Sequence, residues 1–271
     1  FVALAHSLSA VSTGGFSTFD DSLAGLGPGA AAVIMGFSWL GAVSLPLYYL
    51  AWQKGPASLF RDPELRALIV ATALLGTLLT LWMPTGGSRL DALLMGMSAQ
   101  STTGFSTVAV SDLDDASKLA MTGAMLIGGS VGSSAGGFKL LRLLLLLRLL
   151  QLVLVRTAAP RHAVIDVRLD GQRVDDTDLW RAMLLMVMFA LLVFLSWLAF
   201  VANGYAALDA LFEVASASGT VGLSTGITRP DLEPLLKAVL CFDMLAGRVE
   251  IFALLVVLYP GTWFGKRSET L

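Results

Sequence analysis

Three short stretches of the chain place polar, small and bulky apolar residues in the same order. They are Ser12-Thr13-Gly14-Gly15-Phe16, Ser101-Thr102-Thr103-Gly104-Phe105 and Gly219-Thr220-Val221-Gly222-Leu223. In such a loop a Gly lets the backbone turn a carbonyl inward without a Cβ in the way. Carbonyl oxygens arranged in this manner can replace the hydration shell of an ion. The repetition therefore predicts a pathway in which equivalent loops strip water from a cation.

Each loop follows a short apolar run that predicts a helix too short to cross a membrane. The register extends upstream, because Leu90-Asp91-Ala92-Leu93 aligns with Leu208-Asp209-Ala210-Leu211. We expect re-entrant pore helices at residues 1–10, 90–100 and 207–218. The C-terminal end of each helix is partly negative, so a cation at the loop that follows would be stabilised.

The composition excludes most soluble proteins, since 56% of the residues are hydrophobic and 14% are charged. A membrane crossing takes about 20 helical residues, and four further apolar runs predict spans at 30–49, 65–83, 179–201 and 235–263. The net charge of −2 gives no basic surface for nucleic acid. The single Cys241 excludes an internal disulfide and is expected to pack as a small apolar residue. The predicted fold class is an all-α polytopic membrane protein.

The segment from 118 to 155 is too long for one crossing and has an unusual interruption. Residues 128–137, the Gly/Ser segment, hold five Gly and three Ser. Because Gly costs about 1 kcal/mol relative to Ala inside a helix, a straight helix is not expected there. Non-helical backbone at membrane depth persists only where it is buried in protein or lines water. The segment is either a kink that permits close helix packing or an irregular loop that blocks the pathway.

The polar connectors predict an orientation. Residues 164–174 alternate around Asp170-Gly171, which is typical of a hairpin. Basic residues collect in two connectors and at the end, and by the positive-inside rule these lie in the cytoplasm: Lys54, Arg61, Arg66, Arg156, Arg161, Arg168, Arg173, Lys266 and Arg267. Acidic residues follow the three loops, which indicates that the loops lie near the outer face.

The order of these elements carries a resemblance. Thr220-Val221-Gly222-Leu223 is close to the filter of potassium channels, and two further matches are Gly136-Gly137-Phe138-Lys139 and Gly247-Arg248-Val249-Glu250. Together with the other two loops, they make the chain resemble the Trk/Ktr/HKT superfamily of potassium transporters, most closely the bacterial Trk-type membrane subunit. The resemblance implies helix–pore loop–helix units around a pseudo-fourfold pore, as in potassium channels.

The resemblance also implies how the chain is divided. Residues 1–53 would be the second pore repeat without its outer helix, and 54–160 the third repeat with the broken inner helix. Residues 161–178 would form a cytoplasmic hairpin linker, and 179–271 the fourth repeat. The first repeat, with its own filter loop, is expected to precede Phe1.

The implied function is uptake of K⁺ across the cell (inner) membrane by a gated, channel-like transporter. K⁺ would bind only at the filter residues Thr13, Gly14, Gly15, Thr102, Thr103, Gly104, Thr220, Val221 and Gly222. The gate would comprise Gly128, Gly129, Gly132, Gly136, Gly137 and Arg248. No other cofactor is implied in this chain. The implied partners are a second copy, membrane lipid and a cytosolic nucleotide-binding ring of the RCK type.

Each of these residues also has a simpler interpretation. The loops could be ordinary turns, although a turn needs neither repetition nor a preceding short helix. Arg248 could form a buried ion pair with Asp243 or Glu250, although a charge at membrane depth is more often functional. Lys139 is expected at the membrane interface as a weaker gate candidate. His6 and His162 are expected to be a packed polar residue and a solvated linker residue, because no His/Cys cluster accompanies them.

Two other classes of protein remain as alternatives. An ion-coupled solute symporter with broken helices would have inverted halves around a midplane site, whereas this chain repeats in parallel. A membrane-embedded hydrolase would need a Ser/His or Asp/Asp pair at membrane depth, and the sequence offers none. An enzyme is therefore not expected.

Overall fold

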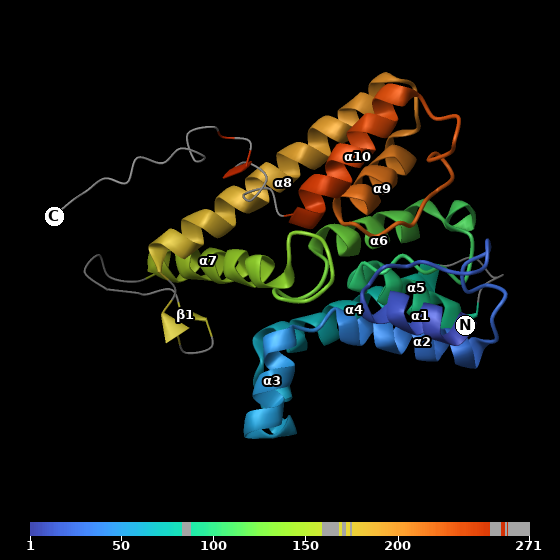
Figure 1. Cartoon of the computed structure of the whole chain (residues 1–271). Helices are drawn as coiled ribbons and strands as arrows, with labels where there is room; N and C mark the ends of the chain where they lie inside the picture. The colour runs from blue at the N-terminus through green and yellow to red at the C-terminus, as the bar shows by residue number, and fades with distance from the viewer. Residues whose placement is uncertain are drawn as a thin grey trace.

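The computed structural model describes residues 1–82, 88–158, 168–169, 172–173, 175–249, 256–257 and 259. Helices form most of this part of the chain (Figure 1). Its strands are β1 (Arg168–Leu169) and β2 (Gln172–Arg173), which pair antiparallel with Arg168 opposite Arg173. The hairpin predicted around Asp170-Gly171 is confirmed at these four residues, while the turn itself lies outside the described residues.

The N-terminal part contains α1 (Val2–Val11), α2 (Pro28–Gly41), α3 (Leu45–Lys54) and the short 3₁₀ helix η1 (Pro56–Arg61). The span predicted over 30–49 is not one straight helix, because the chain bends by 87° between α2 and α3. Pro46 has no N–H, so it suits the first turn of a new helix but not the interior of a longer one. The Leu45 N–H instead donates to the Gly132 carbonyl at 3.1 Å. The Gly/Ser segment therefore holds the bend, and α3 projects away from the other helices (Figure 1).

The middle part contains α4 (Pro63–Trp82), α5 (Arg89–Ser101), η2 (Val110–Asp112), α6 (Asp115–Ile127) and α7 (Leu140–Ala158). The second pore helix is α5, and a capping box fixes its start. Ser88 Oγ accepts from the Asp91 N–H at 3.1 Å, and Asp91 accepts from the Ser88 N–H at 3.0 Å. The predicted break is also present, because residues 128–139 separate α6 from α7.

The C-terminal part contains α8 (Asp176–Ala202), α9 (Ala207–Ser218) and α10 (Pro234–Val249). The third pore helix, α9, has the predicted bounds. Within the described residues, Pro63–Trp82 and Thr177–Ala202 are long and apolar enough to span a membrane, and α2 with α3 could form one further, bent span. The predicted span 235–263 is described as helix only as far as Val249.

Helix α6 links the pore helices α5 and α9 through one apolar core. Met95 of α5, Met121 of α6 and Phe212 of α9 are fully buried in one cluster. At the edge of this core Lys118 of α6 forms a 2.9 Å salt bridge with Asp209 of α9. These contacts join the second and third loop-bearing regions, and so fix the relative positions of their loops.

Candidate functional site: three Thr/Gly loops above a Gly/Ser segment

The three Thr/Gly loops, residues 12–16, 101–105 and 219–223, share one backbone conformation. The φ angles of Thr13, Thr102 and Thr220 are 51°, 56° and 53°. Two residues later, Gly15, Gly104 and Gly222 have φ angles of 68°, 88° and 96°. Positive φ is uncommon for any residue except Gly, and unusual for a β-branched residue such as Thr. The sequence repeat is therefore matched by a repeat of backbone geometry.

The way each pore helix ends explains the positive φ of Thr. The residue after each Thr donates its N–H to the carbonyl five residues earlier: Gly14 to Ser9 (2.8 Å), Thr103 to Ser98 (3.1 Å) and Val221 to Ser216 (2.8 Å). Each Thr donates its own N–H to the Ala three residues before it, at 3.0–3.3 Å. This is the Schellman ending of a helix, with Thr in the left-handed position that usually holds Gly. The Ser-Ala pair that accepts these bonds recurs in all three repeats and is a further sequence signal of this ending.

The loops lie against one another in a fixed order. A Cβ on Gly15 would overlap the carbonyl oxygen of Thr103, and one on Gly104 would overlap that of Val221. By contrast, a Cβ on Gly222 would meet no atom within 4 Å. The first loop thus contacts the second and the second contacts the third, whereas the Gly face of the third is open.

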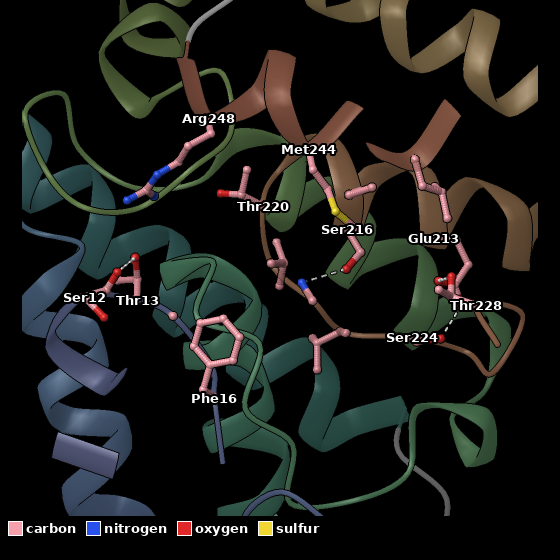
Figure 2. A pocket seen from close by; sticks show the side chains of 16 residues that line it. Ser12, Thr13, Phe16, Glu213, Ser216, Thr220, Ser224, Thr228, Met244 and Arg248 are labelled. Atoms are coloured by element: carbon pink, nitrogen blue, oxygen red, sulfur yellow. Dashed lines mark hydrogen bonds between the residues drawn. The ribbon is translucent and has the colours of Figure 1, made fainter. Parts of the chain in front are cut away.

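A cavity of about 610 Å³ occupies the open side (Figure 2). It lies between the first loop, at Thr13 and Phe16, and the third loop with α9 and α10. Residues of the first and third loops line it together with Met244 and Arg248 of α10. The cavity therefore separates the first loop from the third.

The Gly/Ser segment lies directly against all three loops. Thr13 Oγ1 donates to the Ser134 carbonyl at 2.9 Å, and the Gly136 N–H donates to Thr102 Oγ1 at 2.6 Å. A Cβ on Gly136 would overlap both the Gly219 carbonyl and Thr220 Oγ1. One segment therefore contacts each left-handed Thr, and only Gly fits at position 136.

The Gly/Ser segment is also tied to the surrounding helices. The Ser130 N–H donates to the Ala42 carbonyl at 3.0 Å, and the Val131 N–H donates to the Glu64 carboxylate at 3.2 Å. Gln100 Nε2 donates to the Gly128 carbonyl at 2.6 Å. These bonds give the irregular backbone the partners that it needs away from water.

The remaining glycines of the segment serve close approach or unusual dihedrals. Gly128, Gly132 and Gly137 have φ angles of 72°, 74° and 76°, and a Cβ on Gly129 would lie 2.6 Å from that of Ala135. All the glycines predicted to form the gate therefore belong to one ordered loop beneath the Thr/Gly loops.

Arg248 reaches the Gly/Ser segment from the last turn of α10. Its Nη1 donates to the Ser134 carbonyl at 2.9 Å, so this carbonyl accepts from both Arg248 and Thr13. The alternative of an ion pair with Asp243 was wrong among the described residues, because Asp243 is fully buried against α8 and accepts from Ser196 Oγ at 2.8 Å. Glu250 lies outside the described residues.

Three other residues test the sequence analysis. Lys139, expected at the membrane interface, is 9% exposed within the protein, and its Nζ donates to the Ala135 carbonyl. Cys241 was expected to pack inside, but it is exposed on α10. His6 is packed as predicted: it is 1% exposed, and its ring stacks on Phe105 with centroids 6.0 Å apart. His162 lies outside the described residues.

The described residues contain no group of three or more His, Cys, Asp or Glu side chains that could hold a metal ion. What the site offers to a cation is carbonyl and hydroxyl oxygen. Fold and site together define an all-helical, multi-pass membrane protein in which short helices present equivalent loops to one point.

The comparison with known families agrees with this class. The model of the TrkH family, described as cation transport protein, matches residues 1–260. The chain therefore belongs to the TrkH cation transport family.

Several relatives resemble the chain along almost its full length. It is 31% identical to the Trk system potassium uptake protein TrkH of Halomonas elongata and 33% identical to that of Vibrio parahaemolyticus. Each match covers 97% of this chain and 57% of the relative. The crystal structure of the potassium transporter TrkH from Vibrio parahaemolyticus superimposes with a TM-score of 0.86 at 30% identity, covering 97% of this chain and 59% of that one. The chain thus spans little more than half the length of the relatives that it matches.

The contact between Thr102 and Gly136 can be tested directly. Thr102→Val keeps the shape of the side chain but leaves the buried Gly136 N–H without an acceptor. We expect a loss of about 1–3 kcal/mol of stability, measured as a lower unfolding temperature in detergent. Thr102→Ser retains the hydroxyl and should behave like the wild type. Equal unfolding temperatures for Val and Ser would show that this hydrogen bond does not hold the segment in place.

Proposed function

We propose that the chain forms most of a gated, channel-like pathway for uptake of K⁺ across the cell membrane, with the three Thr/Gly loops as its filter. The observation that carries this proposal is that Thr and Gly have positive φ at the same two positions of each loop. In addition, the first loop contacts the second and the second contacts the third. Such loops present carbonyl oxygens from the ends of three short helices, where the helix dipoles favour a cation. The names of the relatives, potassium uptake proteins of Trk systems, support K⁺ as the transported ion.

The filter residues are those that the sequence indicates: Thr13, Gly14, Gly15, Thr102, Thr103, Gly104, Thr220, Val221 and Gly222. In two loops the bulky residue that follows is buried against the preceding unit, since Phe105 is 0% and Leu223 is 4% exposed. Their counterpart Phe16 is 80% exposed at the cavity. We propose that a further pore repeat of the complete protein covers Phe16 and fills the open side beside Gly222. The pathway would then be a pseudo-fourfold pore.

The same view assigns the repeats and the gate. Residues 1–53, 54–160 and 179–271 would be the second, third and fourth repeats, joined by a cytoplasmic linker at 161–178. The Gly/Ser segment would close the pathway on the cytoplasmic side of the filter. It is supported in this role by its contacts with all three loops and by its bond to Arg248.

The wider assembly is proposed from the family resemblance. The filter would face the periplasm or the cell exterior, and the basic connectors the cytoplasm. The chain would work as the membrane subunit of a Trk system in a homodimer surrounded by lipid. A cytosolic nucleotide-binding ring of the RCK type would regulate the gate, and the membrane chain itself would need no cofactor.

The proposed filter predicts that its three equivalent glycines, Gly15, Gly104 and Gly222, determine ion preference. In the complete protein, Gly104→Ala should reduce the ratio of ⁸⁶Rb⁺ to ²²Na⁺ uptake into liposomes by about tenfold or more, because the methyl group would displace the Val221 carbonyl and the positive φ adds about 1 kcal/mol of strain. Gly222→Ala should be as harmful if a fourth loop fills the open side. Gly123→Ala is the matched control, since a Cβ there meets no atom within 4 Å. Unchanged selectivity in both filter variants would contradict the proposal.

The proposed gate predicts the effect of Arg248. A positive charge that bonds the Ser134 carbonyl holds the segment in the pathway and repels a cation. Arg248→Ala should therefore raise K⁺ flux without changing the ⁸⁶Rb⁺ to ²²Na⁺ ratio. Met244→Ala alters the same face of α10 one turn away and serves as the control. A folded Arg248→Ala protein with wild-type flux and regulation would make Arg248 a purely structural residue.

A further inference from the structure

Glu213 is an acidic residue of α9, and its side chain is buried beside the third Thr/Gly loop. It is 4% exposed. Within the part of the chain that the structure describes, its partners are hydroxyl and amide groups rather than a cation. A buried carboxylate is costly unless hydrogen bonds replace its lost hydration. The donors that compensate it therefore indicate what the residue holds in place.

All of these donors lie just beyond the third loop. Oε1 accepts from Ser224 Oγ at 2.6 Å, from the Thr225 N–H at 2.8 Å and from Thr225 Oγ1 at 3.0 Å. Oε2 accepts from Thr228 Oγ1 at 2.7 Å. One carboxylate thus ties residues 224–228 back to the helix that precedes the loop (Figure 2).

A second polar side chain on the same helix completes the attachment. Ser216, three residues after Glu213 and so on the same helix face, accepts from the Gly222 N–H through its Oγ at 3.1 Å. The backbone is therefore attached to α9 on both sides of Leu223, at Gly222 and at residues 224–228. The carbonyls of Val221 and Gly222 lie in a stretch with little freedom to shift.

In the other two loops, the Ser that is equivalent to Ser224 is also hydrogen-bonded. By the alignment of the repeats, His6, Met95 and Glu213 occupy one position, and Ser17, Ser106 and Ser224 another. His6 Nε2 hydrogen-bonds Ser17 Oγ at 3.1 Å, the same pairing as Glu213 with Ser224.

Met95 cannot form such a bond, and Ser106 is held differently. Its N–H donates to Ser22 Oγ at 3.1 Å, and its carbonyl accepts from the Leu23 N–H at 3.0 Å. Both partners belong to the neighbouring region. The Ser that follows each Thr/Gly loop (Ser17, Ser106 or Ser224) is thus hydrogen-bonded in all three described loops, and its partner differs from loop to loop.

We infer that Glu213 is a positioning residue for ion selectivity: it fixes the carbonyls of the third Thr/Gly loop without touching the ion. This inference rests on the proposed function. A filter prefers one cation only while its oxygens keep their spacing and number, and the carboxylate makes the largest set of side-chain bonds behind that loop. His6 has the corresponding role behind the first loop.

The test compares charge with geometry in the complete transporter. Glu213→Ala should lower the ratio of ⁸⁶Rb⁺ to ²²Na⁺ uptake by about tenfold or more, because it removes the four bonds that hold residues 224–228 and lets the loop carbonyls leave the spacing that distinguishes the two ions. Glu213→Gln keeps an acceptor for Ser224 and Thr225 and can donate to Thr228. It should stay within about threefold of the wild-type ratio, because neutral hydrogen bonds retain roughly half the strength.

The control is Phe200→Leu, which trims a fully buried side chain of α8 in a core cluster that contains no residue of the Thr/Gly loops. It should lower the unfolding temperature but leave the ratio unchanged. Should Glu213→Ala fail to fold, Thr228→Val removes one donor from the far side and should still lower the ratio.

Three outcomes would overturn the inference. A folded Glu213→Ala protein with the wild-type ratio would show that the attachment does not set selectivity, while the proposed function would stand. Equal losses in Glu213→Ala and Glu213→Gln would assign the effect to charge rather than position. A wild-type protein that takes up neither ion would overturn the proposed function and this inference with it.

Discussion

The contact on which the rest of the site depends is that between a Gly and the carbonyl of the next loop. At Gly15 and Gly104 there is no room for even a methyl group, because the oxygens of Thr103 and Val221 occupy the space. The left-handed Thr at the end of each pore helix turns the chain so that this contact forms. A short helix, a Schellman ending and a Gly without a side chain therefore act together, and their repetition brings the three loops into contact in order.

The same constraint explains the form of the segment below. Because the three Thr residues lie close together, a single irregular loop can bond to two of them and pass against the third. A regular helix could not approach so closely, since Gly136 already touches backbone. The Ser134 carbonyl then offers one point at which α10, through Arg248, and the first loop meet. A substitution of Arg248 or of Thr13 therefore alters a carbonyl to which the other side chain also donates.

Local patterns in the sequence were sufficient for the loops, the short helices and the break after α6, because each depends on neighbouring residues. Features set by distant residues were not predictable. The 87° bend before α3 depends on a bond to Gly132, and Lys139 is buried by the path of its own segment. The attachments of Glu213 and His6 became visible only once the loops were folded back on their helices, although the aligned repeats already placed these residues in one column.

We propose above that the three Thr/Gly loops coordinate a dehydrated cation together. The most direct measurement is a crystal structure of the complete protein grown in Rb⁺, with anomalous diffraction used to locate the ion. We expect anomalous peaks on the axis between the loops, beside the carbonyls of Thr102, Thr103, Thr220 and Val221. Rb⁺ bound elsewhere in the protein, with no peak between well-ordered loops, would contradict it.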